Sequence, residues 1–224
     1  MTEMDKYLRC TGIIDCDAEA VSGKAWALTG KLRTDREKAV ALFYFVRDEI
    51  KHNPYAPAQA AADHKASVTL ERGSGQCQHK SALLVALARA AGIPARPGYV
   101  DIRDHLLSDK FRAMVGGDNL LIQHGYVELY VGGRWLHASP AYDRATCEQN
   151  DFVPVEFDGL DDARDSARDR EGRPHIEHVK DHGHFDDFPW DFIESYRKEW
   201  VAAIGREWAE YTAIVKGHTA ERDG

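Results

Sequence analysis

Cys77 is the residue whose type and position best suit nucleophilic chemistry. It follows a Gly-Ser-Gly stretch and opens a helix-like run, QHKSALLVALARAAG. A free thiol has a pKa near 8.5 and is only about 3% thiolate at pH 7, but a helix N-terminus and a nearby imidazolium lower that pKa. The glycines, Gly75 among them, would let a substrate carbonyl approach the Cys77 amide. The alternative is a small buried hydrophobic role, the usual fate of a lone cysteine.

His124 is the favoured base for such a nucleophile. A thiolate needs a partner that stabilises it and protonates the leaving group. The stretch QHGYVELYV around His124 alternates with a period of two, so a rigid strand would hold the imidazole. The alternative is a half-buried strand histidine bonded to backbone. A cysteine at a helix head, a histidine on a strand and a polar residue on the next strand is the order of the papain-like cysteine fold.

The elements that must position these residues are predicted from periodicity and end signals. Thr34 and Glu37 form a capping box, Asp17 can cap an earlier helix, and Gly132-Gly133 lies between two alternating runs. The patterns predict helices over 17–30, 35–50 and 78–92, and strands over 95–104 and 120–139. Helices followed by antiparallel strands indicate an α+β fold, with the nucleophile helix packed on an antiparallel sheet.

The remaining segments are predicted from composition. Residues 58–69 and 105–119 read as loops, and 158–188 as a polar excursion rich in His and Asp. Apolar residues recur at helical spacing over 189–216, including Trp200, Ile204, Trp208, Tyr211 and Val215. We therefore expect a core over 1–157, the excursion over 158–188 and a C-terminal helical extension over 189–224 that packs on the core.

Three stretches in order resemble the transglutaminase-like superfamily, in particular its bacterial cysteine-protease type. They are EKAVALFYFVRDEIKHNPYAP, GSGQCQHKSALLVALARAAGIPARPGYV and HGYVELYVGGRWLHASPAYD, and they cover roughly residues 35–143. The positions that match the family pattern are Gly75, Cys77, Ala82, Leu83, Gly92, Ile93, Pro94, Ala95, Arg96, His124, Val127, Glu128 and Trp135.

By this resemblance Cys77 is the nucleophile and His124 the base. The family usually places an aspartate about four residues after the hairpin tryptophan, where this chain has Ser139. Asp143 is therefore slightly favoured as the residue that orients His124, because an anion stabilises an imidazolium, with Ser139 as the alternative. Gln76, beside the nucleophile, or Gln78 could assist the oxyanion hole, although an exposed polar role is favoured for each.

The composition limits the classes of partner. Apolar residues make up 43% and charged residues 29% of 224, and the formal net charge is −8. Such a chain lacks the basic surface that nucleic acids and anionic membranes require. With no apolar leader segment and four cysteines, we expect a cytoplasmic protein that keeps its thiols reduced.

The cluster from His175 to His184 raises the question of a metal. Imidazoles and carboxylates could bind zinc, but no HExxH pattern is present. A solvated loop is favoured over a metal site, and a lid over the Cys77 cleft is a further alternative. We expect no metal and no cofactor.

The sequence as a whole predicts cysteine-dependent acyl transfer on peptide or protein amides. Hydrolysis is favoured over transglutaminase crosslinking, because the chain is small and has no EF-hand-type calcium loop. A non-catalytic binding module that keeps the fold, supported by Ser139, and a zinc hydrolase remain alternatives. Substrate and oligomeric state stay open.

Overall fold

The computed structural model describes residues 3–114, 117–203, 205 and 213. Its helical segments are η1 (Glu3–Leu8), α1 (Glu19–Thr29), α2 (Asp35–Tyr44), the π-helical η2 (Phe45–Glu49), η3 (Ala61–His64), α3 (Ala66–Arg72), α4 (Cys77–Ala90), α5 (Asp109–Met114), α6 (Arg144–Asn150) and α7 (Trp190–Ala203). Its strands are β1 (Lys51–His52), β2 (Ser74–Gly75), β3 (Ala95–Asp104), β4 (Leu120–Val131), β5 (Arg134–Ala138) and β6 (Ile176–His184).

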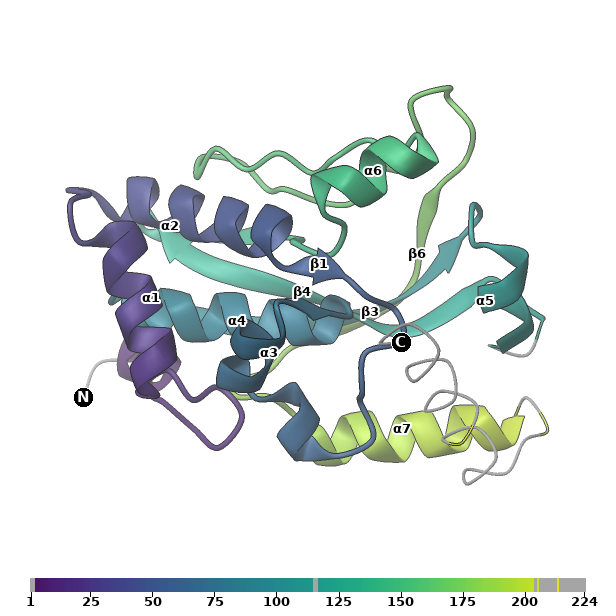
Figure 1. Ribbon diagram of the computed structural model, residues 1–224, viewed down its shortest axis with the longest axis horizontal. Helices are drawn as coiled ribbons and strands as arrows, with labels where there is room; N and C mark the ends of the chain where they lie inside the picture. Colours follow the sequence, from purple (N-terminus) through teal and green to yellow (C-terminus); the bar gives the residue numbers. More distant parts are fainter. Residues whose placement is uncertain (1–2, 115–116, 204, 206–212, 214–224) are drawn as a thin grey trace.

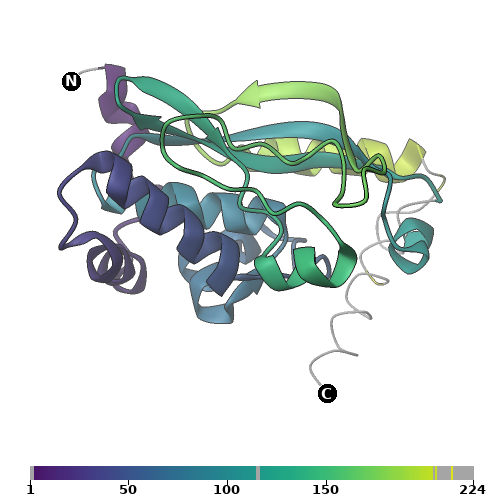
Figure 2. The same ribbon diagram turned by 90° about the horizontal axis from the view of Figure 1, so that it is seen from above.

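A four-stranded antiparallel sheet carries the fold, in the order β5-β4-β3-β6. Helices α1 to α4 lie together on one face of it, with α4 against β3 and β4 (Figures 1 and 2). The α4 side chains from Ala82 to Ala88 are fully buried, so the whole middle of this helix is core. The predicted α+β architecture, with the nucleophile helix on an antiparallel sheet, is confirmed.

Local signals set several boundaries. Thr34 and Glu37 form the predicted capping box of α2, and β4 turns into β5 through Gly132 and Gly133, both at positive φ. The predicted Asp17 cap is wrong: Ala18 precedes α1 and no side chain caps it.

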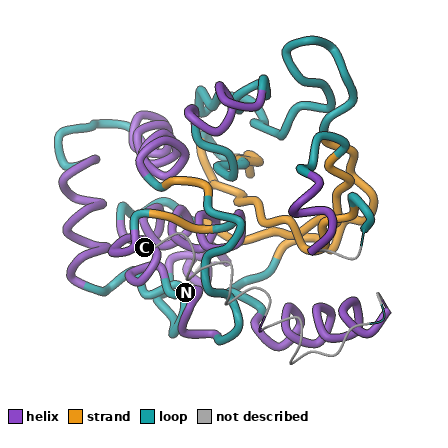
Figure 3. The backbone as a smooth tube through the Cα atoms, turned by 45° about the vertical axis from the view of Figure 1, so that its right-hand side comes forward, coloured by secondary structure: helices purple, strands orange, loops and turns teal. Residues whose placement is uncertain are grey.

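Three predicted loops contain regular structure. Residues 58–69 include η3 and the start of α3, and 105–119 include α5. The polar segment 158–188 ends in β6, which pairs with β3 at the edge of the sheet. The segment between α6 and β6 is loop (Figure 3), and within it Ala163 makes a parallel bridge to Ala138 of β5. The segment 158–188 therefore contacts the sheet at two places. Its β6 pairs with β3 at one edge, and Ala163 bridges to β5 at the other edge.

The C-terminal helix lies along the molecule as α7 (Figure 1). Ile193 and Val201 are its buried residues, and Ile193 belongs to the main core. The predicted helical positions Ile204, Trp208, Tyr211 and Val215 lie outside the described residues. In the part of the chain that is described, no helix is both long and apolar enough to cross a membrane.

The cysteines are not all reduced, contrary to the sequence prediction. Cys10 and Cys16 form a disulfide, and Cys77 and Cys147 are free thiols. Cys147 is buried, and burial raises its pKa to about 11. Cys77 is thus the free thiol that faces a cavity.

Candidate active site

Cys77 is the first residue of α4, as the sequence predicts. The chain leaves α3 through Gly73 at φ 65° and pairs briefly with β1 before the helix begins. His79 then caps the helix, since its Nδ1 accepts a hydrogen bond from the Gln76 N–H at 3.2 Å while its Nε2 donates to the Pro57 carbonyl at 2.9 Å. Burial lowers the pKa of His79 to about 3, so the ring is neutral and able to accept. The N-terminus of α4, where the nucleophile lies, is therefore stabilised by the His79 side-chain cap as well as by the packing of the helix.

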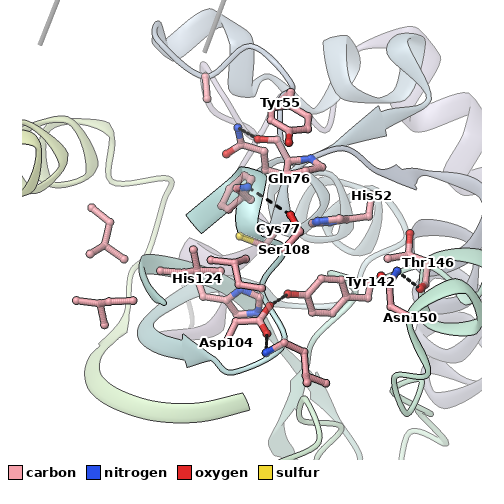
Figure 4. A pocket seen from close by; sticks show the side chains of 18 of the residues that line it. His52, Tyr55, Gln76, Cys77, Asp104, Ser108, His124, Tyr142, Thr146 and Asn150 are labelled. Atoms are coloured by element: carbon pink, nitrogen blue, oxygen red, sulfur yellow. Dashed lines mark hydrogen bonds between the residues drawn. The ribbon is translucent and has the colours of Figure 1, made fainter. Parts of the chain in front are cut away.

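His124 lies on β4 and contacts Cys77. The two side chains are hydrogen-bonded, and both face one cavity (Figure 4). The close approach depends on Gly125, because a Cβ there would lie 3.0 Å from the Gln78 Cα and 3.2 Å from its backbone N. The absence of a side chain at this position therefore lets β4 sit against the head of α4. Gly125, which directly follows the histidine, was not among the residues predicted from the sequence to act at the site.

Asp165 is the acid that orients His124. Its Oδ2 lies 3.1 Å from the His124 Nε2, and each side chain is 5% exposed. Since Nε2 is taken by the carboxylate, Nδ1 is the nitrogen left for the thiol. Sequence reasoning missed Asp165, because it is one of several aspartates in the polar excursion and no spacing distinguishes it.

The edge of the sheet brings Asp165 to the site. The Ala163 N–H donates to the His137 carbonyl at 2.8 Å, and the Ser139 N–H donates to the Ala163 carbonyl at 2.9 Å. The Ser139 hydroxyl then donates to Asp165 Oδ2 at 2.5 Å. Ser139, at the usual position of the acid, thus holds an aspartate that comes from elsewhere in the chain.

Asp143 has a different structural place from the one predicted. It caps α6, accepting from the Thr146 N–H at 2.8 Å and from the His52 N–H at 2.6 Å. In the described part of the chain, the carboxylate hydrogen-bonded to the His124 ring at Nε2 is that of Asp165, not that of Asp143. The expectation that Asp143 or Ser139 accepts from His124 is therefore corrected to Asp165.

The predicted oxyanion residues also serve other contacts. The Gln76 Nε2 donates to the carbonyls of Pro54 and Ala56, at 3.1 and 3.0 Å, so both of its amide hydrogens hold the loop that follows β1. The Gln78 Nε2 donates to the Gln123 carbonyl at 2.9 Å. A Cβ at Gly75 would lie 2.6 Å from the His79 Cβ, so this glycine permits packing inside the helix head. The oxyanion donors available at this point are backbone N–H groups at the start of α4.

The tail histidines lie in separate environments. The His182 Nε2 contacts Asp101 at 2.9 Å, the His184 Nδ1 lies 3.5 Å from Glu128, and the His175 ring packs on Phe152 with centroids 4.0 Å apart. Within the described ranges no group of three or more histidine, cysteine or acidic side chains has a geometry for a metal ion.

Electrostatics favour an ion pair between Cys77 and His124. Burial by itself would raise the pKa of the Cys77 thiol, but the His124 charge, its hydrogen bond and the backbone amides of Gly125 and Gln78 hold that pKa below its ordinary value. Burial would lower the pKa of His124, but Cys77 and Asp165 raise it well above 6.5. Burial opposes ionisation of Asp165 as well, yet its bonds to His124 and Ser139 lower its pKa to about 2. Each group thus stabilises the charged form of the next.

The cavity at Cys77 has a volume of about 420 Å³. The apolar side chains that line it include Tyr55, Leu107, Phe111, Leu121, Ile122 and Trp200. Among the described residues that line it, Asp104 has an acidic and Arg197 a basic side chain, and both are hydrogen-bonded. Asp104 accepts from the Leu106 N–H at 2.9 Å and from the Tyr142 hydroxyl at 3.2 Å, and Arg197 donates to Gln78 Oε1 at 3.0 Å.

Comparison with known proteins gives the class. The profile of the transglutaminase-like superfamily matches residues 23–140, just over half of the 224-residue chain. The chain belongs to this superfamily, as the resemblance in the sequence indicates. The match ends before Asp165 and α7, so the acid and the C-terminal wall of the cavity lie outside it.

A solved structure shares the fold, and a second aligns with part of the chain. A proposed cysteine protease from Cytophaga hutchinsonii aligns with TM-score 0.50 and 17% identity, over 82% of this chain and 55% of that one. A proposed protease from Parabacteroides distasonis aligns with TM-score 0.40 and 20% identity, over 61% of this chain and 25% of that one. This chain therefore spans only about half of the first neighbour and a quarter of the second. No curated protein matches the chain by sequence.

Proposed function

We propose that the protein catalyses cysteine-dependent acyl transfer on amide bonds, with hydrolysis as the reaction. The observation that carries the proposal is the Cys77–His124–Asp165 arrangement at one end of a solute-sized cavity. A thiolate nucleophile, an imidazolium acid and an orienting carboxylate are the groups that this chemistry requires.

The reaction has two stages. The Cys77 thiolate attacks the carbonyl carbon, and the oxyanion that forms accepts hydrogen bonds from backbone N–H groups at the start of α4. The His124 imidazolium gives its proton to the departing amine, the C–N bond breaks, and a thioester on Cys77 remains. Water then attacks the thioester carbonyl while neutral His124 takes a proton. The C–S bond breaks, which restores the thiolate–imidazolium pair and releases a carboxylic acid that loses its proton to solvent.

The composition of the cavity favours an uncharged, apolar group beside the scissile amide. Apolar side chains of its wall come from the loop after β1, the region around α5, the start of β4 and α7. The acidic Asp104 and the basic Arg197 side chains are already hydrogen-bonded. An amide next to a large apolar side chain is therefore the substrate class that the cleft suits best.

Phe111→Ala tests this substrate class. Truncation of an aromatic wall should raise KM for substrates with a large apolar side chain about tenfold, because burial of that surface contributes to binding. Iodoacetamide labelling of Cys77 should stay unchanged. Leu160→Ala, at an exposed position, is the matched control. Equal KM values for Phe111→Ala and wild type would contradict the assignment of the wall.

The pH dependence of hydrolysis should be bell-shaped. The rate should rise as pH increases through the lowered pKa of Cys77, and fall as pH passes the raised pKa of His124. The plateau should include neutral pH. A kcat/KM profile with a single rise near the ordinary thiol pKa of about 8.5 would contradict the ion pair.

Peptide libraries distinguish the possible reactions. Wild type and Cys77→Ala would be incubated with peptides that carry glutamine and large apolar residues, with and without an added primary amine, and analysed by mass spectrometry. We expect cleavage or deamidation that requires Cys77 and does not require the amine. Products found only with the amine would instead support crosslinking, and no Cys77-dependent product would support a binding module.

A further inference from the structure

The backbone next to His124 is irregular. In the β3–β4 pairing His124 lies opposite Val100, whereas Leu121 lies opposite Ile102. Strand β4 therefore contains one residue more than β3 over this stretch, which is a β-bulge. Gln123 adopts φ 53°, a left-handed conformation that non-glycine residues rarely take. Bulges beside active sites re-aim side chains, and this one directly precedes the candidate base.

Asp101 replaces the ladder hydrogen bond that the bulge removes. Its Oδ1 accepts the Gln123 N–H at 2.8 Å, and Asp101 is 3% exposed. A buried backbone N–H without a partner is costly, so this carboxylate stabilises the strained residue.

Asp101 is itself held from two further elements. The His182 Nε2 of β6 lies 2.9 Å from Oδ1, and the Tyr196 hydroxyl of α7 donates to Oδ2 at 2.7 Å. His182 is the extra residue at a second bulge, because Tyr99 pairs with Gly183 and Val100 with Asp181. The Asp101 carboxylate thus contacts residues of β4, β6 and α7 close to His124 in the sheet.

We infer that Asp101 is a positioning residue for His124, acting through the backbone of Gln123. This rests on the proposed role of the Cys77–His124 pair. Asp101 fixes the left-handed turn at Gln123, the turn sets the direction of the His124 side chain, and the imidazole reaches the thiol. One function of β6 and α7 is then to hold Asp101 in place.

The test uses iodoacetamide labelling of Cys77 at pH 6 on folded protein, with folding checked by circular dichroism. Asp101→Ala should lower the labelling rate about tenfold or more, because the strained conformation at Gln123 then loses the acceptor that supports it. Asp101→Asn keeps an acceptor for the Gln123 N–H and should stay within about threefold of wild type. Tyr196→Phe removes the hydrogen bond from the Tyr196 hydroxyl to Asp101 and should have a small effect on the labelling rate.

A rescue experiment separates positioning from general stability. Gln123→Gly and Gln123→Ala both remove the side chain and differ in tolerance of positive φ. In the Asp101→Asn background, which keeps the site folded, the glycine variant should label several-fold faster than the alanine variant. Where Asp101→Ala folds, adding Gln123→Gly should restore most of its rate.

Three results would overturn the inference. The first is an Asp101→Ala protein that folds and labels at the wild-type rate. The second is equal labelling of the glycine and alanine variants at Gln123. The third is a wild-type Cys77 that labels no faster than in the urea-denatured chain, which would remove the proposed function together with the inference. Fast wild-type labelling with either of the first two results would overturn the inference alone.

Discussion

Replacing Asp165 by asparagine should lower kcat/KM by about 10²- to 10⁴-fold, the largest effect expected from any residue outside the Cys77–His124 pair. The Asp165 carboxylate lies 3.1 Å from the His124 Nε2 and stabilises the imidazolium. An asparagine has nearly the same shape but no charge, so the His124 pKa should fall and the Cys77 pKa should rise. The measurement is kcat/KM on the cleaved peptide, with the Cys77 labelling rate at pH 6 as a second readout.

Asp143→Asn is the matched control for this prediction. It makes the same chemical change at Asp143, which was favoured from the sequence because an anion stabilises an imidazolium, and asparagine also caps helices well. Because Asp143 bonds the His52 and Thr146 amides, the variant should keep most of the activity. Ser139→Ala should have an intermediate effect, since it removes one hydrogen bond to Asp165. A larger loss from Asp143→Asn than from Asp165→Asn would contradict the assignment of the acid.

Gly125→Val should abolish the fast labelling of Cys77 and lower kcat/KM by about 100-fold or more. A Cβ at this position would meet the backbone of Gln78 at 3.0 Å, and backbone at a helix head cannot move aside cheaply. The strand must therefore shift away from α4, which carries His124 away from the thiol. Displacements of about 1 Å are expected to cost catalysis on this scale. The Cys77 labelling rate and kcat/KM are both measured on folded protein, at a temperature below its Tm.

Gly23→Ala is the control for Gly125→Val. A Cβ at Gly23 meets nothing within 4 Å, and this residue lies within α1. The alanine should raise helix stability slightly and leave activity unchanged. A Gly125→Val protein with wild-type labelling would show that the strand and helix do not need this close approach.

The nucleophile half of the site could be predicted because its signals are local. The helix from Cys77, the hairpin at Gly132-Gly133 and the alternation around His124 each depend on neighbours in sequence. Hydrophobic periodicity predicts such elements directly, because burial of one face requires apolar residues at regular spacing. The meeting of Cys77 and His124 then followed from the resemblance to a known order of elements.

The acid could not be predicted, because its position depends on the path of an irregular loop. Asp165 follows His124 by 41 residues and reaches it only after Ala163 bridges to the edge of β5. Strand β6 was missed for a related reason. It is an exposed edge strand with two register shifts against β3, so it lacks the alternation by which strands are recognised.

The most direct test of the central claim is the rate of Cys77 carboxamidomethylation at pH 6 in wild type and in His124→Gln. Cys147, which is buried and has a raised pKa, reports on unfolding within the same sample. We predict that wild-type Cys77 reacts at least about tenfold faster than the urea-denatured chain and that His124→Gln loses this enhancement. Equal rates in wild type, His124→Gln and denatured protein would contradict an activated thiolate–imidazolium pair.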